Sequence, residues 1–296
     1  MAFDIRTLQD GNRIVGISSG DDANLGRIEA GRIGGSFAWW LAQKVQKNNW
    51  DLNICVGYDP RLSSMGLREG IMTGFQMFGA KHFDAGLAVA PAMQMSTTMP
   101  FYEFDGAVMI TGGSLPGDKN GFRFFTAEGE LSEEDIAKVL GYAAKYVFVG
   151  EWYETENTNL MDMYAAHLRR ALSEKLNEHG GNLKDVHIIV DASNGSCGFF
   201  AEKVLKPLGT DISGSLFLEP DGSFPNHEPN PENEKALQAI CKAVVDNKAS
   251  LGIRFNSDGS EIAVVDSSGK VVPRNETFHV DEDAFAQAIR KIILLF

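Results

Sequence analysis

The sequence predicts an α/β protein of two consecutive domains, followed by a C-terminal amphipathic helix. Three observations lead to this fold class. The chain has 296 residues, 44% of them hydrophobic, and at about 100–200 residues per domain this length suggests two domains. Segments with helical periodicity alternate with short apolar segments typical of strands, as in layered α/β architectures. The last residues repeat apolar side chains at helical spacing.

The first domain is expected over residues 1–150. Residues 28–46 place apolar side chains near one helical face, and an apolar strand is predicted directly after them. Ser132 and Asp135 form a pattern typical of a helix start. The predicted elements are, in order, a helix at 28–46, strand at 52–59, helix at 67–78, strand at 82–87, helix at 91–99, strands at 107–111 and 122–126, and helix at 136–146.

The second domain is expected over residues 151–275, because the polar and acidic stretch 150–159 is typical of a domain boundary. A second helix and strand cycle follows. The predicted elements are a helix at 160–176, strand at 186–191, turn at 192–195, helix at 199–208, helix at 234–247, strand at 251–255, and a hairpin of 262–265 with 271–272.

Residues 276–296 are predicted to form the amphipathic helix, and its end is strongly apolar. Two interpretations stay open. The helix packs on its own domain, or it is a docking element for another protein. The candidate interaction residues are Ile292, Ile293, Leu294, Leu295 and Phe296.

Charge and cysteine content exclude several classes of function. The net charge of −13 opposes binding to nucleic acid or to an anionic membrane surface. No apolar run is long enough for a membrane span, and the N-terminus does not resemble a signal or transit peptide. Cys55, Cys197 and Cys241 are far apart and form no Cys-x-x-Cys pair. We therefore expect a soluble protein of a reducing compartment, with cytoplasm and plastid stroma both open.

Two polar loops are the candidate sites. Residues 109–122 leave a predicted strand with several glycines, whose backbone N–H groups can approach an anion, although an ordinary strand-exit turn explains them too. Ser114 lies there without a neighbouring histidine to activate it. Residues 255–261 present oxygen side chains from Asn256, Asp258 and Ser260 at a spacing used by cation loops. A solvated turn explains this spacing equally well. For His227, a hydrogen-bonded loop position is the simplest interpretation.

Five segments in order resemble the α-D-phosphohexomutases, the phosphoglucomutase/phosphomannomutase family, over roughly residues 5–275. They are VGYDPRLSS, MITGGSLPGDKNGF, VDASNGSCGFFAEKVLKPLG, FLEPDGSFPNHEPNPEN and LGIRFNSDGSEIAVVD. The resemblance implies two three-layer α/β domains with mixed sheets flanked by helices. It also implies transfer of phosphate between the 1- and 6-positions of a hexose, by a phosphoserine on the first domain and Mg²⁺ held by three aspartates on the second. The family's sugar-reading third domain and phosphate-binding fourth domain are not matched.

The residues that carry this chemistry in the family are changed here. The phosphoserine position falls on Gly113, between Gly112 and Ser114, which takes the place of a histidine. In the metal motif, Asn256 and Ser260 replace two of the three aspartates and leave Asp258. Glu261 replaces an arginine, and the family's Ile-Arg-Gly is Ile14-Val15-Gly16. We therefore expect no catalytic residues, no bound metal and no cofactor.

The leading hypothesis is an inactive homologue that acts as a structural or interaction subunit, with other protein subunits as partners. Phosphoryl transfer depends on positioning and on neutralising the charge of the phosphate. Loss of the phosphate carrier, the metal and a cation together removes these main contributions to catalysis. One alternative is weak sugar-phosphate binding, for which the candidate ligands are Arg61, Ser114, Lys119 and Arg123. The other alternative is a residual or split mutase that uses Ser114.

Overall fold

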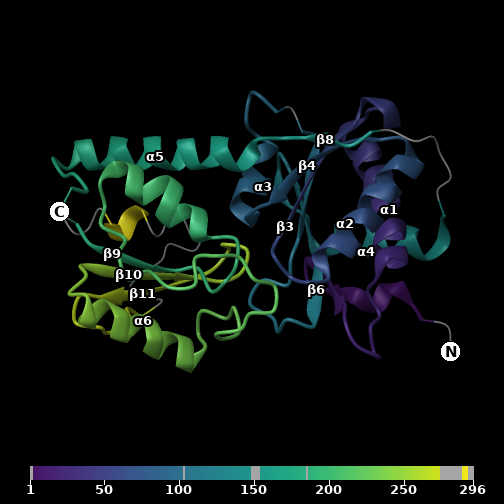
Figure 1. Ribbon diagram of the computed structural model, residues 1–296. Coiled ribbons are helices and arrows are strands. Elements are labelled where there is room, and N and C mark those ends of the chain that lie inside the picture. Colours follow the sequence, from purple (N-terminus) through teal and green to yellow (C-terminus); the bar gives the residue numbers. More distant parts are fainter. Residues whose placement is uncertain (1–2, 103, 148–153, 185, 274–288, 293–296) are drawn as a thin grey trace. The chain divides into compact units, whose positions relative to one another are not determined.

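The computed structural model describes residues 3–102, 104–147, 154–184, 186–273 and 289–292 (Figure 1). The chain divides into two compact units. The first comprises Met1–Gly112 and Gly117–Leu160, and the second comprises Gly113–Pro116 and Met161–Phe296. Apart from Gly113–Pro116, the second unit begins after residue 160.

The first unit is built around a mixed sheet with strand order β1-β2-β6-β5-β3-β4-β8, and β7 pairs with β6. β3 runs parallel to β4 and β5, whereas β6 runs antiparallel to β5 and β2. The strands are β1 (Gln9–Asp10), β2 (Arg13–Ile17), β3 (Asn53–Tyr58), β4 (Lys81–Leu87), β5 (Gly106–Ile110), β6 (Lys119–Thr126), β7 (Gly129–Glu130) and β8 (Glu156–Asn157).

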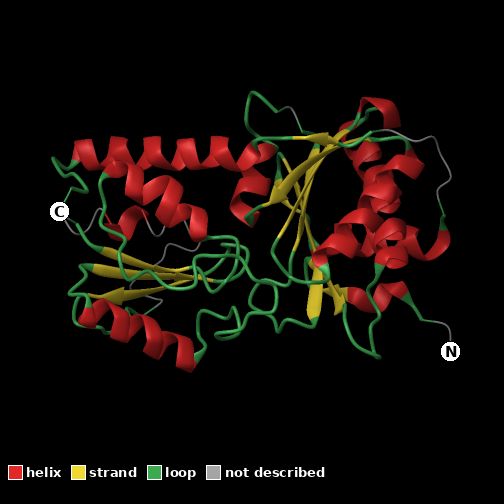
Figure 2. Ribbon diagram, in the orientation of Figure 1, coloured by secondary structure: helices red, strands yellow, loops and turns green. Residues whose placement is uncertain are grey.

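Helices cover both faces of this sheet (Figures 1 and 2). Three of them, α1 (Arg27–Val45), α2 (Ser64–Phe78) and α4 (Glu133–Lys145), lie on one face, and α3 (Ala90–Ser96) lies on the other. The 3-10 turns η1 (Ile5–Leu8) and η2 (Asn49–Asp51) complete the unit.

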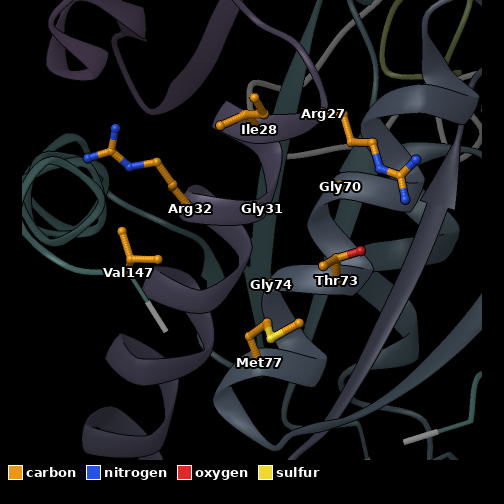
Figure 3. A pocket seen from close by; sticks show the side chains of 9 residues that line it. All are labelled: Arg27, Ile28, Gly31, Arg32, Gly70, Thr73, Gly74, Met77 and Val147. Carbon is orange, nitrogen blue, oxygen red and sulfur yellow. The ribbon is translucent and has the colours of Figure 1, made fainter. Parts of the chain in front are cut away.

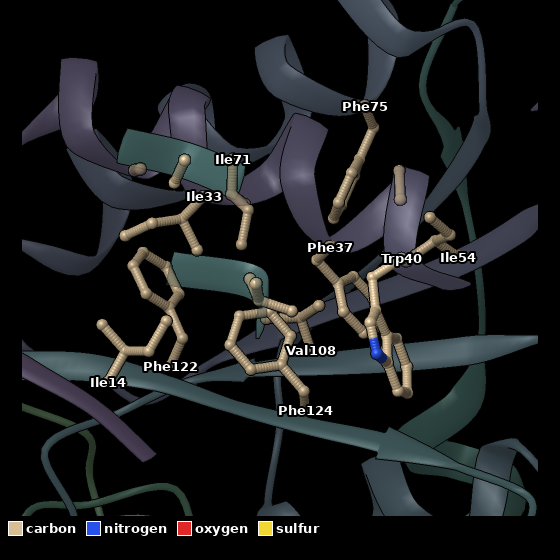
Figure 4. Packing of buried hydrophobic residues seen from close by; sticks show 14 of the residues in the cluster. Ile14, Ile33, Phe37, Trp40, Ile54, Ile71, Phe75, Val108, Phe122 and Phe124 are labelled. Atoms are coloured by element: carbon tan, nitrogen blue, oxygen red, sulfur yellow. The ribbon is translucent and has the colours of Figure 1, made fainter. Parts of the chain in front are cut away.

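A hydrophobic core fills the space between these three helices and the sheet (Figure 4). Phe37 of α1 lies at its centre, with its ring 4.6 Å from the Phe124 ring of β6 and 6.4 Å from the Phe75 ring of α2. Alternate residues of the strands point into the core, as the period of two in a strand requires. They include Ile54, Val56, Val108, Ile110, Phe122 and Phe124.

The second unit contains a three-stranded mixed sheet with the order β11-β10-β9. β9 (Ile188–Asp191) is parallel to β10 (Leu251–Phe255), which is antiparallel to β11 (Ile262–Asp266). The helix α6 (Glu234–Asp246) packs on one face, in a cluster that includes Ile189 and Val265. On the other face lies a π-helical segment, η3 (Phe200–Leu205), and then α5 (Leu160–Glu178) (Figure 1). Phe200 packs edge-on against Phe255 of β10.

The architecture confirms the predicted fold class, because both units have mixed sheets flanked by helices. The Ser132 cap is also confirmed, since its Oγ accepts a hydrogen bond of 3.2 Å from the Asp135 backbone N–H. The strand β2 was not predicted, although its residues alternate between half-buried and buried. No helix in the described ranges has both the length and the hydropathy needed to cross a bilayer.

One predicted element of the second unit is confirmed and one differs from the prediction. The hairpin is confirmed, because Val265 forms an antiparallel bridge with Val271 and the backbone N–H of Val272 donates to the carbonyl of Val264 at 2.8 Å. The residues of β11 also pair with β10. The segment predicted as one helix at 199–208 is the π-helical segment followed by the 3-10 turn η4 (Lys206–Leu208). Pro207 has no backbone N–H to donate, so a regular helix cannot continue through it.

Candidate functional site

A buried ion pair between Arg61 and Asp59 packs against the Gly-rich loop that follows β5. Arg61 is 1% exposed, and its Nε lies 3.1 Å from Oδ2 of Asp59. Its Nη1 donates to the backbone carbonyl of Lys119 at 2.9 Å, and Thr111 donates to the same Asp59 oxygen at 2.8 Å. A Cβ at Gly112 would lie 2.5 Å from Cζ of Arg61. A side chain at position 112 would therefore displace the guanidinium of Arg61, which lies in the interior of the first unit.

Gly113, at the family's phosphoserine position, adopts a left-handed backbone with φ of 57°. This region is costly for a residue with a side chain. The carbonyl of Gly113 accepts a hydrogen bond of 2.8 Å from Ser257 Oγ. The backbone here is thus fixed in a conformation that suits glycine and disfavours serine.

The hydroxyl of Ser114 is engaged by two side chains. Its Oγ donates to Oε2 of Glu261 at 2.8 Å and accepts from Nδ2 of Asn256 at 3.3 Å. All three residues belong to the second unit. Glu261 therefore places a carboxylate next to the hydroxyl, where a phosphate group on Ser114 would be repelled.

Several polar groups of the loop from Asn256 to Glu261 form hydrogen bonds within the loop. Oδ1 of Asn256 accepts from the backbone N–H groups of Ser260 (3.0 Å) and Glu261 (3.2 Å). Nδ2 of Asn256 also donates to Oγ of Ser260 at 3.1 Å. Oδ1 of Asp258 accepts from the backbone N–H of Ser260 (3.1 Å) and from its hydroxyl (2.6 Å). These side chains therefore build a hydrogen-bonded turn.

The turn contains few groups that a divalent cation prefers. Mg²⁺ and Ca²⁺ favour oxygen ligands, above all carboxylates. Asp258 is the carboxylate that remains at the three ligand positions, and the Asn256 amide oxygen already accepts two backbone N–H groups. Within the described ranges, no three or more His, Cys, Asp or Glu residues gather where they could hold a metal ion. The residues present do not fit the Mg²⁺ that the resemblance implies.

The other candidate ligand residues of the first unit lie on β6. Arg123 forms a two-pronged ion pair with Glu130, with both N–O distances at 2.8 Å, and its guanidinium lies 5.5 Å from the ring centre of Phe125. Lys119 is half-buried at the start of the strand. Arg123 is therefore held in an ion pair with Glu130 of the same unit.

A buried charged cluster in the second unit was not predicted. Arg254 and Asp191 are fully buried, and Nη1 of Arg254 lies 3.0 Å from Oδ2 of Asp191. His227 lies 3.2 Å from the same guanidinium, and the carbonyl of Asn230 accepts from it at 2.9 Å. Burial lowers the pKa of Arg254, and the Asp191 charge opposes this effect. The signal was an arginine inside the otherwise apolar strand LGIRF.

His227 is thus a hydrogen-bonded loop residue, as predicted, and it helps to tie its loop to β10. Of the candidate interaction residues at the C-terminus, Ile292 is fully buried. Residues 293–296 lie outside the described residues, so the expected docking element is not described further.

Two family models match the chain. The model of phosphoglucomutase/phosphomannomutase α/β/α domain I matches residues 30–149, and that of domain II matches residues 162–269. The chain belongs to the phosphoglucomutase/phosphomannomutase family.

Individual relatives agree with this assignment. A phosphoglucomutase of Neisseria meningitidis serogroup A is 31% identical over 275 residues, which cover 92% of this chain and 55% of the relative. A phosphomannomutase/phosphoglucomutase of Pseudomonas syringae pv. tomato is 29% identical, over 79% of this chain and 49% of the relative. The chain spans about half the length of the curated relatives it matches.

Solved structures show the same fold. A phosphoglucomutase/phosphomannomutase family protein from Burkholderia thailandensis superposes with a TM-score of 0.75 at 23% identity, covering 90% of this chain and 56% of that one. A structure described as a putative phosphomannomutase from Thermus thermophilus gives a TM-score of 0.76 at 15% identity, over 94% of this chain and 60% of that one.

Proposed function

We propose that this chain is a catalytically inactive member of the phosphoglucomutase/phosphomannomutase family, and that it acts as a structural or interaction subunit of a larger assembly. The observation that carries the proposal is the contact between Ser114 and Glu261, 2.8 Å long. Ser114 directly follows the family's phosphoserine position, and its hydroxyl donates a hydrogen bond to a carboxylate. Phosphoryl transfer needs positive charge around the phosphate, and this site supplies negative charge.

The backbone supports the same proposal. A serine at position 113 would have to adopt the left-handed conformation with φ of 57°, which costs about 1–2 kcal/mol for a residue other than glycine. Ser114 starts one residue further along, and in-line transfer tolerates little displacement of the reacting oxygen, since an error of about 1 Å costs on the order of a hundredfold in rate.

The metal loop supports it as well. The Mg²⁺ of the family would screen the phosphate charge, and one aspartate with two neutral side chains is a poor ligand set for such a hard cation. Asn256 and Ser260 are bonded to each other through Nδ2 and Oγ at 3.1 Å. A cation would have to break these internal hydrogen bonds before it could bind.

Sugar-phosphate binding is the weaker candidate. It needs free cationic side chains, whereas Arg61 is buried against Asp59 and Arg123 is paired with Glu130. Under this alternative, glucose 1-phosphate raises the melting temperature of the protein, because a ligand that binds only the folded state stabilises it. Under our proposal, millimolar glucose 1-phosphate leaves the melting temperature unchanged.

The subunit role is tested by isolating the natural protein under mild conditions and measuring its native mass. We expect a complex in which the protein and at least one other polypeptide occur in constant stoichiometry. A natural protein that runs as a single polypeptide with nothing bound would contradict the subunit role, and mutase activity in the same sample would contradict the loss of catalysis.

A further inference from the structure

A groove on the first unit, formed by α1 and α2, belongs to none of the candidate sites above (Figure 3). Its cavity volume is about 290 Å³. Figure 3 shows Ile28 and Arg32 of α1 on one side of it and Thr73 and Met77 of α2 on the other. All of the lining residues belong to the first unit: Arg27, Ile28, Gly31, Arg32, Gly70, Thr73, Gly74, Met77 and Val147.

The groove exists because the two helices touch through their backbones. A Cβ at Gly74 would lie only 2.1 Å from the carbonyl oxygen of Gly31, so no side chain fills the crossing. Large apolar side chains stand exposed beside this floor, since Ile28 and Val147 are each 76% exposed. Exposed apolar surface that borders a concave floor is typical of a protein-binding site.

The charge around the groove indicates which charge a binding partner should carry. Arg27 is neutralised by Glu69, with 3.0 Å between Nη1 and Oε2. Arg32, by contrast, forms no ion pair with any residue that the structure describes, and its buried Nε has no hydrogen-bond partner there. Arg32 as a whole is half-buried and lines the groove, so a partner that brings a carboxylate to its guanidinium gains a charge-assisted hydrogen bond.

We propose that this groove binds an amphipathic helix of another protein, with its apolar face on the glycine floor and a carboxylate on Arg32. The apolar floor between two helices suits the apolar face of a third helix. A second copy of this chain fits less well, because a two-fold contact at this face would place the two Arg32 side chains near each other. The proposal goes beyond the loss of catalysis and shares no residue with the two candidate loops.

The test uses a fluorescent helical peptide of 18 residues with leucines at i, i+3, i+4 and i+7 and glutamates along one edge of that face. A twin peptide has lysines in place of the glutamates. Binding to the whole chain is followed by fluorescence anisotropy at about 0.15 M salt, where charges more than about 8 Å apart are largely screened. The net charge of −13 then contributes little, and local contacts decide the preference.

We expect saturable binding of the acidic peptide, at least tenfold tighter than binding of its basic twin. Arg32→Glu should reverse this preference, and Ile28→Asp should weaken acidic binding at least tenfold. Trp50→Ser is the matched control, because Trp50 is also an exposed apolar residue of the first unit, 54% exposed, and does not line the groove. It should leave binding unchanged, and all three variants should keep the melting temperature of the wild type.

Three results would overturn the proposal. The first is no saturable binding up to 1 mM peptide. The second is equal affinity for both peptides, or a preference that Arg32→Glu does not reverse. The third is a concentration-dependent dimer in sedimentation equilibrium that Ile28→Asp abolishes, since the groove would then hold a second copy of this chain.

Discussion

Ser114 donates a hydrogen bond to the carboxylate of Glu261, with 2.8 Å between Oγ and Oε2. The two residues lie 147 positions apart in the sequence. They bring a hydroxyl from the Gly-rich loop to the loop that replaces the family's metal motif. Because a carboxylate accepts this hydrogen bond where the family carries an arginine, the local charge disfavours a phosphate on the hydroxyl.

Restoring the carboxylates of the metal loop should create a cation site. In the double variant Asn256→Asp with Ser260→Asp, three carboxylates lie together and repel one another unless a cation screens them. We expect this variant to melt at a lower temperature than the wild type in EDTA, and to gain several degrees with 5 mM Mg²⁺. Differential scanning calorimetry measures both values.

The wild type serves as the control for this variant and should show no Mg²⁺-dependent shift. The single variant Ser268→Asp, in a turn next to Asp266 that does not belong to the metal loop, controls for added charge alone. A wild type that gains as much from Mg²⁺ as the double variant would show that the present loop already binds the cation.

Gly113→Ala should lower the free energy of unfolding by about 1–2 kcal/mol, which is the cost of a left-handed backbone for a residue with a Cβ. Space is not the cause, since the nearest atoms to such a Cβ are Nδ2 of Asn256 and Oδ2 of Asp258, at 3.7 and 3.8 Å. Urea unfolding followed by circular dichroism measures the change.

Gly141→Ala is the matched control. Gly141 lies inside α4, and no atom lies within 4 Å of the position that a Cβ would take, so alanine should stabilise the helix by about 0.5–1 kcal/mol. The interpretation of Gly113 is wrong when both variants change stability in the same direction.

Arg254→Met should destabilise the second unit by about 3–5 kcal/mol, because it leaves the Asp191 carboxylate buried without its cation. Both side chains are fully buried, and the guanidinium also holds the carbonyl of Asn230. Urea unfolding gives the value. Lys242→Met, in the exposed ion pair with Asp246, should leave stability nearly unchanged. Comparable losses in the two variants would refute the role given to burial.

Stability should fall as the pH drops below about 6.5, the ordinary pKa of a histidine, because of His82. Burial lowers the pKa of His82, and the Arg68 charge adds to this effect. Below the ordinary pKa, the unfolded chain binds a proton at His82 that the folded chain does not bind. The free energy of unfolding therefore decreases as the pH falls, until the lower pKa of the folded state is reached. The melting temperature should therefore decrease from pH 7.5 to 5.5.

The variant His82→Gln should show a smaller decrease over the same interval. His82 is buried, and its Nε2 lies 2.8 Å from Oγ1 of Thr155, so glutamine can keep a polar contact without titrating. Identical pH profiles for the wild type and the variant would exclude His82 as the cause.

The layered fold could be predicted because helical and strand periods are local signals. The strand at 251–255 was predicted with its observed bounds, and the predicted helix at 28–46 differs from α1 by one residue at each end. The order of the strands in a sheet is not a local property, so the neighbours of each strand were not predicted. The π-helical segment also has no periodic signal that separates it from an α-helix.

The sequence alone shows which residues of the candidate site are replaced, such as those at Gly113 and Asn256. It does not show which side chains contact one another. The hydrogen bond from Ser114 to Glu261 depends on chain folding over 147 residues. The burial of Arg61 beneath the Gly-rich loop likewise needs the tertiary structure, because arginines are usually exposed unless they are paired.

The loss of phosphoryl transfer is tested most directly by a coupled mutase assay on the natural protein, supplied with glucose 1-phosphate, a bisphosphate activator and Mg²⁺. Peptide mass spectrometry of the same sample then reports phosphate at position 114. We predict a rate equal to that of a heat-inactivated control and an unmodified Ser114. A turnover of about 1 s⁻¹ or more, at the low end for enzymes, together with phosphate on Ser114, would contradict this prediction.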